Sequence, residues 1–361
     1  MLHRKKILFI GGSYNQSTMM FAISQYLKHY ECYFTPHYCD GVLDLFAKAG
    51  MLDFTPIGGI HKKVTEEFFS RMGVAVDYKG LLYDYDLVVT CSDLIIQKNI
   101  RTKKIVLVQE GMTDPENLMY HLVRTLRLPR FLASTSTNGL SDSYEMFCVA
   151  SQGYKDFFVR KGVRPEKIAV TGIPNYDDLA RHTENNFPHH HFVLVATSDA
   201  RETYKLDNRK KFIRKCVAIA AGRPLIFKLH PNENFARAKR EIETYAPGSK
   251  VYTDGDTMAM IANCDVLITQ YSTVVYAGIV FGKEVHSYFD HDTLHQMAPM
   301  QNGGDSARRI ALICESVLHR SPKSNGKTRY PALLSSGRSV YAKAVKRLAS
   351  IMNKTLISCT S

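Results

Sequence analysis

Short apolar segments, each followed at once by a polar cluster, constrain the fold of this chain more than any other feature. Leu225–Leu229 and Asp265–Thr269 have the length and the apolar composition of buried strands in a parallel sheet. The first ends at His230-Pro231 and the second at Gln270-Tyr271-Ser272-Thr273. In an open α/β sheet, ligands bind beyond the carboxyl ends of the strands. We expect the ends of these two strands to be adjacent, and together they predict a ligand site in the C-terminal half of the chain.

The residues at these two strand ends suit a phosphate group. A helix is expected directly after Ser272 and Thr273, and a helix N-terminus attracts anions through its free N–H groups and its dipole. Ser272 or Thr273 would cap this helix and add a hydroxyl donor. Pro231 fixes the backbone beside His230 and would hold the imidazole at the strand end. Either motif alone is better explained as a helix cap or a polar strand end, but the two together favour a nucleotide site.

The motifs KLHP and DVLIT-x-YS-[ST], the short helix after them and GKEV resemble the C-terminal half of GT-B glycosyltransferases. The pattern is most similar to CDP-glycerol glycerophosphotransferases, to bacterial sialyl- and Kdo-transferases with HP and S-S/T motifs, and to UDP-N-acetylglucosamine 2-epimerases. In those families the residues that match His230, Ser272 and Thr273 hold the nucleotide and its phosphate. The resemblance covers about residues 85–320. It implies an α/β fold of two Rossmann-like, doubly wound domains that face a central cleft.

The order of the segments predicts the same organisation. Alternating strands and helices in residues 1–180 indicate an N-terminal, acceptor-side domain. Residues 181–191 are polar and contain proline, as linkers do, and the three consecutive histidines there cannot converge on one metal ion. Residues 192–335 would form the C-terminal, nucleotide-binding domain. Residues 336–361 would form a last helix and a tail, which in GT-B folds can pack back on the first domain.

Gln109-Glu110-Gly111 follows the predicted strand Lys104–Gln109. A carboxylate at a strand end that faces a cleft can act as a general base. The triplet resembles an element of the sialyl- and Kdo-transferases in which the acidic residue deprotonates the acceptor hydroxyl, and this implies that role for Glu110. Gln109 excludes a version with two acids. Asp114 is a second candidate for the base, and a helix cap is the structural alternative for Glu110.

Other strand ends supply further candidates. The Gly-containing loop after the first strand would let a ligand approach the backbone, and in GT-B proteins the equivalent loop faces the cleft. Arg201, after the strand Phe192–Ala196, could reach a diphosphate. The acceptor-side candidates are Gly12, Ser13 and Asp114. The donor-side candidates are Thr197, Ser198, Arg201, Lys228, His230, Pro231, Gln270, Ser272 and Thr273, together with Gly172 and Pro174, which the resemblance places at the floor of the cleft.

The formal net charge of +13 suits nucleic acid, an anionic membrane surface or phosphorylated substrates. No nucleic-acid-binding motif is visible, so nucleic acid is not the expected partner. Residues 117–132 mix apolar side chains with three Arg, as interfacial anchors do, although a core helix with a basic face explains them equally well. No apolar run reaches the roughly 18 residues of a membrane span. The short apolar run at the N-terminus predicts a first strand and not a signal peptide, and the eight scattered cysteines predict reduced thiols. We therefore expect a cytoplasmic protein, and residues 117–132 leave two alternatives open, peripheral attachment to the inner face of the cell membrane or no membrane contact.

These features together predict a metal-independent glycosyltransferase or a glycerophosphotransferase-like enzyme. It would move a sugar or polyol phosphate from a cytidine nucleotide to a cell-surface glycan or lipid acceptor, with CMP- or CDP-linked donors favoured over UDP-linked ones by resemblance. The strand-end residues would stabilise the leaving phosphate, so no metal and no cofactor is expected, and Asp256 is read as a helix cap. One alternative is a UDP-sugar 2-epimerase or hydrolase, which needs several acids, of which Asp93, Glu110 and Asp114 are candidates. Another is a non-catalytic, basic nucleic-acid-binding protein.

Overall fold

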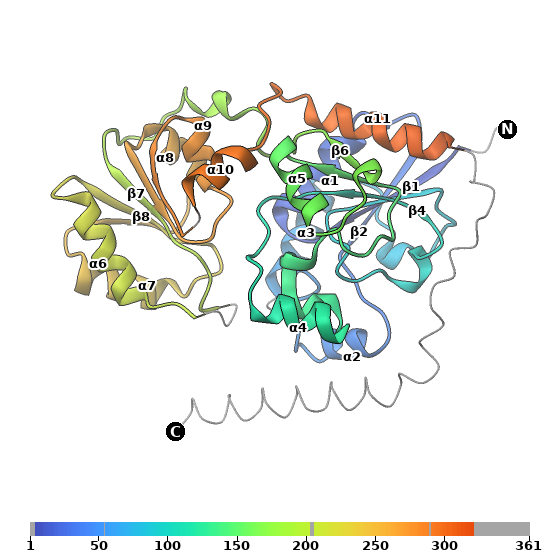
Figure 1. The fold of residues 1–361 in the computed structure, drawn as a ribbon, viewed down its shortest axis with the longest axis horizontal. Coiled ribbons are helices and arrows are strands. Elements are labelled where there is room, and N and C mark those ends of the chain that lie inside the picture. The colour runs from blue at the N-terminus through green and yellow to red at the C-terminus, as the bar shows by residue number, and fades with distance from the viewer. Residues whose placement is uncertain (1–3, 54, 203–205, 289, 321–361) are drawn as a thin grey trace. The chain divides into compact units, whose positions relative to one another are not determined.

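The apolar segments pair into two parallel sheets in the computed structural model (Figure 1). The structure describes residues 4–53, 55–202, 206–288 and 290–320. Every pair of named strands is parallel, and helices follow the strands, so the predicted α/β fold with two doubly wound sheets is confirmed.

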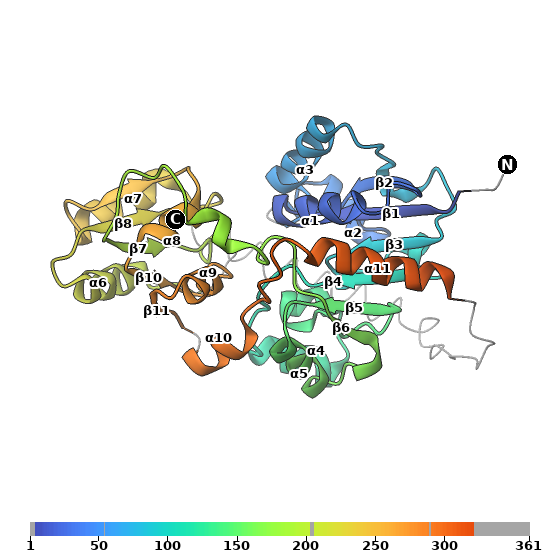
Figure 2. The ribbon, with the colours of Figure 1, turned by 90° about the horizontal axis from the view of Figure 1, so that it is seen from above.

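The first sheet has the strand order β2-β1-β3-β4-β5-β6 (Figure 2). Its strands are β1 (Lys6–Gly11), β2 (Glu31–Pro36), β3 (Leu87–Thr90), β4 (Lys104–Val108), β5 (Met146–Val149) and β6 (Ile168–Val170). Its helices are α1 (Tyr14–Ser24), α2 (Val42–Lys48), α3 (Gly59–Met72), α4 (Leu118–Leu126) and α5 (Gln152–Arg160), and a 3-10 segment covers Arg130–Thr137. Ser13 caps α1 and Ser151 caps α5, each accepting a backbone N–H, so both helices begin directly after a strand.

The second sheet has the order β11-β10-β7-β8-β9. Its strands are β7 (Val193–Ala196), β8 (Leu225–Lys228), β9 (Lys250–Tyr252), β10 (Val266–Thr269) and β11 (Glu284–His286). Its helices are α6 (Arg209–Ala220), α7 (Phe235–Tyr245), α8 (Thr257–Asn263), α9 (Val275–Val280) and α10 (His291–Met297). Asp256 caps α8 through two backbone N–H groups, as predicted.

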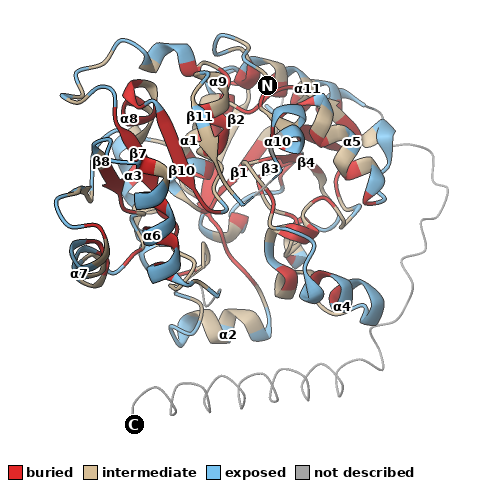
Figure 3. Ribbon diagram, turned by 60° about the vertical axis from the view of Figure 1, so that its left-hand side comes forward, coloured by how far each residue is buried: buried red, intermediate tan, exposed pale blue. Residues whose placement is uncertain are grey.

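Alternating residues of β7 show why this sheet is apolar on both faces. Val193 and Val195 belong to a core that α6 and α7 complete. Leu194 and Ala196 face the other way and join the core that contains α8 and α9 residues. Side chains of a strand alternate between the two faces, so a strand covered on both faces must be continuously apolar. Figure 3 shows these strands buried between more exposed helices.

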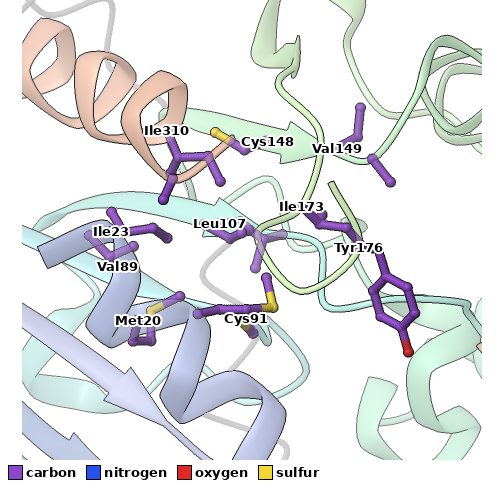
Figure 4. Close-up of a cluster of buried hydrophobic side chains, with 14 of the residues drawn as sticks. Met20, Ile23, Val89, Cys91, Leu107, Cys148, Val149, Ile173, Tyr176 and Ile310 are labelled. Carbon is purple, nitrogen blue, oxygen red and sulfur yellow. The ribbon is translucent and has the colours of Figure 1, made fainter. Parts of the chain in front are cut away.

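The helix α11 (Ser306–His319) packs against the first sheet, although it falls in the range 192–335 predicted for the second domain. It contacts α1 and the strands β3, β4 and β5. Ile310 lies in the cluster of buried side chains around Leu107 and Cys148 (Figure 4). Lys5 and Lys104 donate to the last carbonyls of this helix, Leu318 O at 2.9 Å and Val317 O at 3.0 Å. The apolar face of α11 and these two lysines explain its position.

The described residues up to His319 form one compact unit. The predicted last helix and tail, residues 336–361, lie outside the described residues. The seven cysteines within the described part are free thiols, and six of them are buried, as predicted. Within the same part of the chain, no helix combines the length and the apolar character that crossing a membrane requires.

Candidate functional site

A pocket of about 200 Å³ lies at the strand ends of the first sheet and includes one residue of the second. Glu110, two residues after β4, lines it together with Asn15 of α1. Thr273, which follows β10, closes it from the second sheet. The other lining residues are Gln109, Gly111, Met112, Thr113, Thr135, Asn138, Phe147, Phe158 and Tyr176. The structure therefore brings together two predicted site residues that are more than 160 positions apart, since Met112 N–H donates to Thr273 Oγ1 across 161 positions.

Glu110 is held in a fixed orientation from the start of α1. Ser13 Oγ donates to Glu110 Oε1 at 2.9 Å, and Gln16 Nε2 donates to Glu110 Oε2 at 2.5 Å. The same Ser13 hydroxyl accepts the N–H of Gln16 at 3.2 Å and so caps α1. Glu110 itself is not a helix cap, because α4 begins with Asn117 as its cap. The carboxylate is positioned as a general base would need to be.

Burial raises the pKa of Glu110, and its hydrogen bonds from Gln16 and Ser13 lower the pKa by less. A carboxylate with a raised pKa is a stronger base than an exposed one and accepts a proton more readily. The environment therefore moves Glu110 in the direction that base catalysis near neutral pH requires.

Gly12 influences Glu110 indirectly, through the side chain of Gln16. A Cβ on Gly12 would lie 2.2 Å from Gln16 Oε1 and 3.3 Å from Pro56 Cβ. A larger residue at this position would therefore shift the Gln16 side chain that donates to Glu110. Of the predicted acceptor-side residues, Ser13 touches Glu110 directly and Gly12 supports it. Asp114 accepts from Thr135 Oγ1 at 3.0 Å and does not line the pocket.

The predicted cap of the helix after β10 is wrong. The helix α9 begins at Val275 with Val274 as its cap residue, and no side chain caps it. The hydroxyl of Thr273 instead accepts the N–H of Met112 at 3.2 Å. A Cβ on Gly111 would lie 2.8 Å from Thr273 Oγ1, so Gly111 allows this close approach. Thr273 thus joins the ends of β10 and β4. Ser272 is half-buried beside it.

Asn138 is a site residue that sequence reasoning missed. It lies in a polar stretch that predicts only a loop. Its side-chain amide oxygen is buried and has no hydrogen-bond partner, although it lines the pocket with Glu110. A buried oxygen without a partner is costly, and such atoms in native structures are explained by strain, function or a bound group. Phe147, Phe158 and Tyr176 give the same pocket an apolar wall.

His230 lies at the end of β8 in a second cluster. Its Nδ1 accepts the N–H of Asn232 at 3.3 Å and lies 3.7 Å from Asp199 Oδ2. The neutral ring therefore carries its proton on Nε2, where it can donate to a ligand. Asn232 Nδ2 also lies 3.4 Å from His61 Nε2 of α3, a residue of the first sheet's helices. This cluster does not line the pocket around Glu110.

A buried polar network supports the His230 backbone. His230 N–H donates to Thr197 Oγ1 at 3.2 Å and to Glu233 Oε2 at 2.9 Å. Arg209 Nη2 pairs with Glu233 at 2.9 Å, and Arg209 Nε pairs with Asp207 at 2.9 Å. The side chains of all three charged residues are at most 4% exposed. Asp207, Arg209 and Glu233 are further residues of this site that no sequence motif indicated.

The same hydrogen-bond network includes other residues that were predicted to bind the nucleotide donor. Ser198 Oγ donates to Gln270 Oε1 at 2.8 Å, and Gln270 Nε2 donates to Asp207 Oδ1 at 2.8 Å. Thr197 donates to Glu233. These side chains are buried and fix the strand ends of β7, β8 and β10 to one another.

The remaining predicted donor residues have local partners. Arg201 forms a bidentate pair with Glu241 at 2.7 and 2.8 Å, which occupies its guanidinium. Lys228 is buried and donates to Leu229 O at 2.9 Å, and burial lowers its pKa. A Cβ on Gly172 would lie 2.2 Å from Ser306 Oγ, so this glycine makes room for the start of α11. Pro231 follows His230 on the surface, and Pro174 precedes Tyr176 by two residues.

The strands β8 and β10 are not neighbours, contrary to the expectation of adjacent strand ends. β7 lies between them, so their ends are about 10 Å apart at the usual strand spacing. β7 and β10 are, however, the pair at which the strand order reverses. Doubly wound sheets bind ligands at this switch point. Thr197 and Ser198 follow the end of β7 and residues 270–273 follow the end of β10, so they lie at its two sides.

No protein-family model and no curated protein matches the sequence. Solved structures do match the fold. A putative UDP-N-acetylglucosamine 2-epimerase from Listeria monocytogenes aligns with a TM-score of 0.54 and 13% identity over 89% of this chain and 98% of that one. The UDP-GlcNAc 2-epimerase of Neisseria meningitidis, solved with UDP-GlcNAc bound, gives 0.53 and 13% over 86% and 100%. S. aureus MnaA, solved with UDP, gives 0.52 and 12% over 89% and 100%.

At these identities the likeness establishes the fold. The chain has the two-sheet GT-B fold of the UDP-GlcNAc 2-epimerases, as the motifs implied.

Proposed function

We propose that this chain is an enzyme that transfers a group from a nucleotide-activated donor to a hydroxyl of an acceptor bound beside Glu110. One observation carries the proposal. Among the described residues, Glu110 is the sole carboxylate that lines the pocket formed at the strand ends of both sheets. A single positioned base is what deprotonation of one acceptor hydroxyl requires.

Under this proposal the reacting hydroxyl of the acceptor donates to Glu110, and a neighbouring hydroxyl of the acceptor donates to Asn138 Oδ1. The Ser13 and Gln16 hydrogen bonds hold the carboxylate during proton transfer. The acceptor oxygen then attacks the activated carbon or phosphorus of the donor, and the bond to the leaving nucleotide phosphate breaks. The apolar wall of Phe147 and Phe158 keeps water from competing with the acceptor.

The donor would bind at the switch point between β7 and β10. His230 Nε2–H and backbone N–H groups after β10 would stabilise the charge that develops on the leaving phosphate. The proposed donor is a cytidine nucleotide, CMP- or CDP-linked, with a UDP-linked donor as the alternative. This arrangement requires neither a metal nor a cofactor, and the acceptor is proposed to be a cell-surface glycan or a lipid.

The donor proposal predicts ligand-induced stabilisation. CMP or CDP should raise the thermal unfolding midpoint more than UDP or GDP, because a ligand that binds only the native state stabilises it. At a ligand concentration about 100 times Kd, the gain is about 2.7 kcal/mol. His230→Ala should reduce the shift. His190→Ala, a change at an exposed linker histidine, is the matched control and should keep it. If none of the four nucleotides stabilises the protein, the donor site is wrong.

Asn138 provides a second test. Asn138→Ala should lower kcat/KM about 3- to 10-fold, the value of one lost hydrogen bond of about 1 kcal/mol. Its thermal unfolding midpoint should not fall, because the amide oxygen has no partner in the protein to lose. A variant that loses stability but keeps full kcat/KM would show that Asn138 has only a structural role.

A UDP-sugar 2-epimerase or hydrolase is the second candidate, since the matched solved structures include such enzymes. Its chemistry needs several acids around the sugar. Asp93 is instead fully buried and bound by Arg130 at 3.0 Å and by the N–H groups of Gly139 and Ser141, and Asp114 lies outside the pocket lining. Incubation with UDP-GlcNAc, followed by NMR for a C2 epimer or released UDP, separates the two candidates. Either product, formed without an added acceptor, would favour the second.

A further inference from the structure

A second, larger cavity of about 490 Å³ lies on the first sheet's side of the chain, between α4, the segment Arg130–Leu140 and the end of α5. Its lining is strongly cationic. Five basic side chains and one carboxylate line it: Arg124, Arg127, Arg130, Lys161, Arg164 and Asp142. The same segment of the chain lines both this cavity and the pocket around Glu110. Thr135 and Asn138 line the pocket, whereas Thr137, Gly139 and Leu140 line the cavity.

Internal ion pairs account for only part of this charge. Arg164 pairs with Asp142 at 2.8 Å, and Arg130 pairs with Asp93 at 3.0 Å. Lys161 lies 3.6 Å from Glu116.

Two exposed arginines remain without a carboxylate. Arg124 donates to Tyr120 Oη at 3.0 Å, and among the described residues neither Arg124 nor Arg127 has an acidic partner. Lys161, which also lines the cavity, is buried 4.7 Å from the Tyr120 ring centroid, and desolvation lowers its pKa. Such a site suits a phosphate group, which guanidinium groups bind through paired hydrogen bonds.

The helix beside the cavity is exposed and apolar. Leu118 and Leu126 of α4 are 76% and 61% exposed, and Met119 and Leu122 are exposed as well. Tyr120 and Val123 face inward and anchor the helix. In Figures 1 and 3 α2, which carries the exposed Val42 and Leu45, lies on the same side as α4. Exposed leucines next to arginines are typical of surfaces that enter the headgroup region of a bilayer.

We propose that α4 and this cavity form a docking site for an anionic phospholipid surface, with Arg124 and Arg127 on a lipid phosphate and the leucines of α4 in the interface. The charges of the possible binding partners favour an anionic lipid surface. A second copy of the chain carries +13 and would be repelled. Residues 321–361 contain eight Lys and Arg and no Asp or Glu, so they do not complement a cationic cavity either. Docking through this surface does not require the proposed transfer reaction.

The test is sedimentation of the full chain with vesicles of phosphatidylcholine alone or mixed with phosphatidylglycerol. The chain should bind only the mixed vesicles, and salt should weaken binding. The double variant Arg124→Gln/Arg127→Gln should bind about 30-fold more weakly, the loss expected for two basic residues at an anionic surface. Lys239→Gln/Arg240→Gln removes the same charge from exposed positions of α7 and should stay within about 3-fold of the wild type.

A second pair of variants tests the apolar contribution. Leu122→Ser/Leu126→Ser should weaken vesicle binding about 10-fold, whereas Leu312→Ser, at an exposed leucine of α11, should not. Glu110→Gln should bind vesicles as the wild type does, which separates membrane docking from catalysis. Equal binding by the arginine variant and its α7 control would overturn the proposal. So would stabilisation by free glycerol phosphate without any binding to vesicles, because the cavity would then be a site for a soluble anion.

Discussion

Glu110→Gln is expected to reduce turnover by about 10²- to 10⁴-fold, the usual contribution of a general base. The substituted amide keeps the size of the side chain and a hydrogen-bonding oxygen for Ser13, but it cannot accept a proton. The measurement is kcat at saturating donor and acceptor once a nucleotide has been identified. Glu145→Gln, the same change at an exposed carboxylate before β5, is the matched control and should leave kcat unchanged.

The same variant should be at least as stable as the wild type near neutral pH. Burial raises the pKa of Glu110 in the native state, so between the unfolded and folded pKa values the native state binds more protons than the unfolded state. The free energy of unfolding therefore falls as the pH rises through this window. At pH values above the window this loss of stability persists. Glutamine carries no charge and avoids this cost. Turnover of the wild type should rise over the same window as Glu110 loses its proton. A Glu110→Gln protein that unfolds more readily at neutral pH and keeps its turnover would show that the carboxylate is structural.

Arg209→Met should be the most destabilising single change among the site residues. It leaves the buried Glu233 carboxylate without its ion pair and Asp207 with only Arg201 Nε at 3.8 Å, and breaking a buried ion pair costs about 3–5 kcal/mol. It also removes the hydrogen bond to Ser198 O at 3.0 Å. Urea unfolding followed by circular dichroism gives the change in the free energy of unfolding.

Arg308→Met is the control for this experiment. Arg308 pairs with Asp305 on an exposed surface of α11, and exposed ion pairs contribute little. Equal unfolding midpoints for the two variants would mean that the buried network does not stabilise the strand ends. If Arg209→Met does not fold, Arg209→Lys keeps the charge and loses the paired geometry, and it should still weaken nucleotide-induced stabilisation.

Most strands could be predicted because a strand that is buried on both faces of its sheet is a continuous apolar run in the sequence. Ile7 to Ile10 of β1 and Leu87 to Thr90 of β3 are all buried. β9 gave no such signal, since Lys250–Tyr252 is a three-residue edge strand that is partly exposed. The sequence therefore predicted the fold class but not the strand order that puts β7 between β8 and β10.

The candidate site was predictable only where a residue's role follows from its place at a strand end. Glu110 and Thr273 were found in this way, and they lie on one pocket. Asn138 was missed because an unpaired amide oxygen in a polar loop has no sequence pattern. Arg209 was missed because its partners Glu233 and Ser198 come from other segments of the chain, and such a network depends on tertiary contacts. The expected cap failed because the Thr273 hydroxyl accepts a backbone N–H from the other sheet instead.

The position of α11 has a consequence for biosynthesis. A ribosome that has made all six strands of the first sheet has made only about half of the chain, and the helix that covers β3, β4 and β5 is still about 135 residues away. Until Ile310 and its neighbours emerge, the apolar side chains of β3, β4 and β5 that α11 covers stay exposed. Nascent chains stalled before Ser306 should therefore recruit chaperones, and those stalled well beyond His319 should release them.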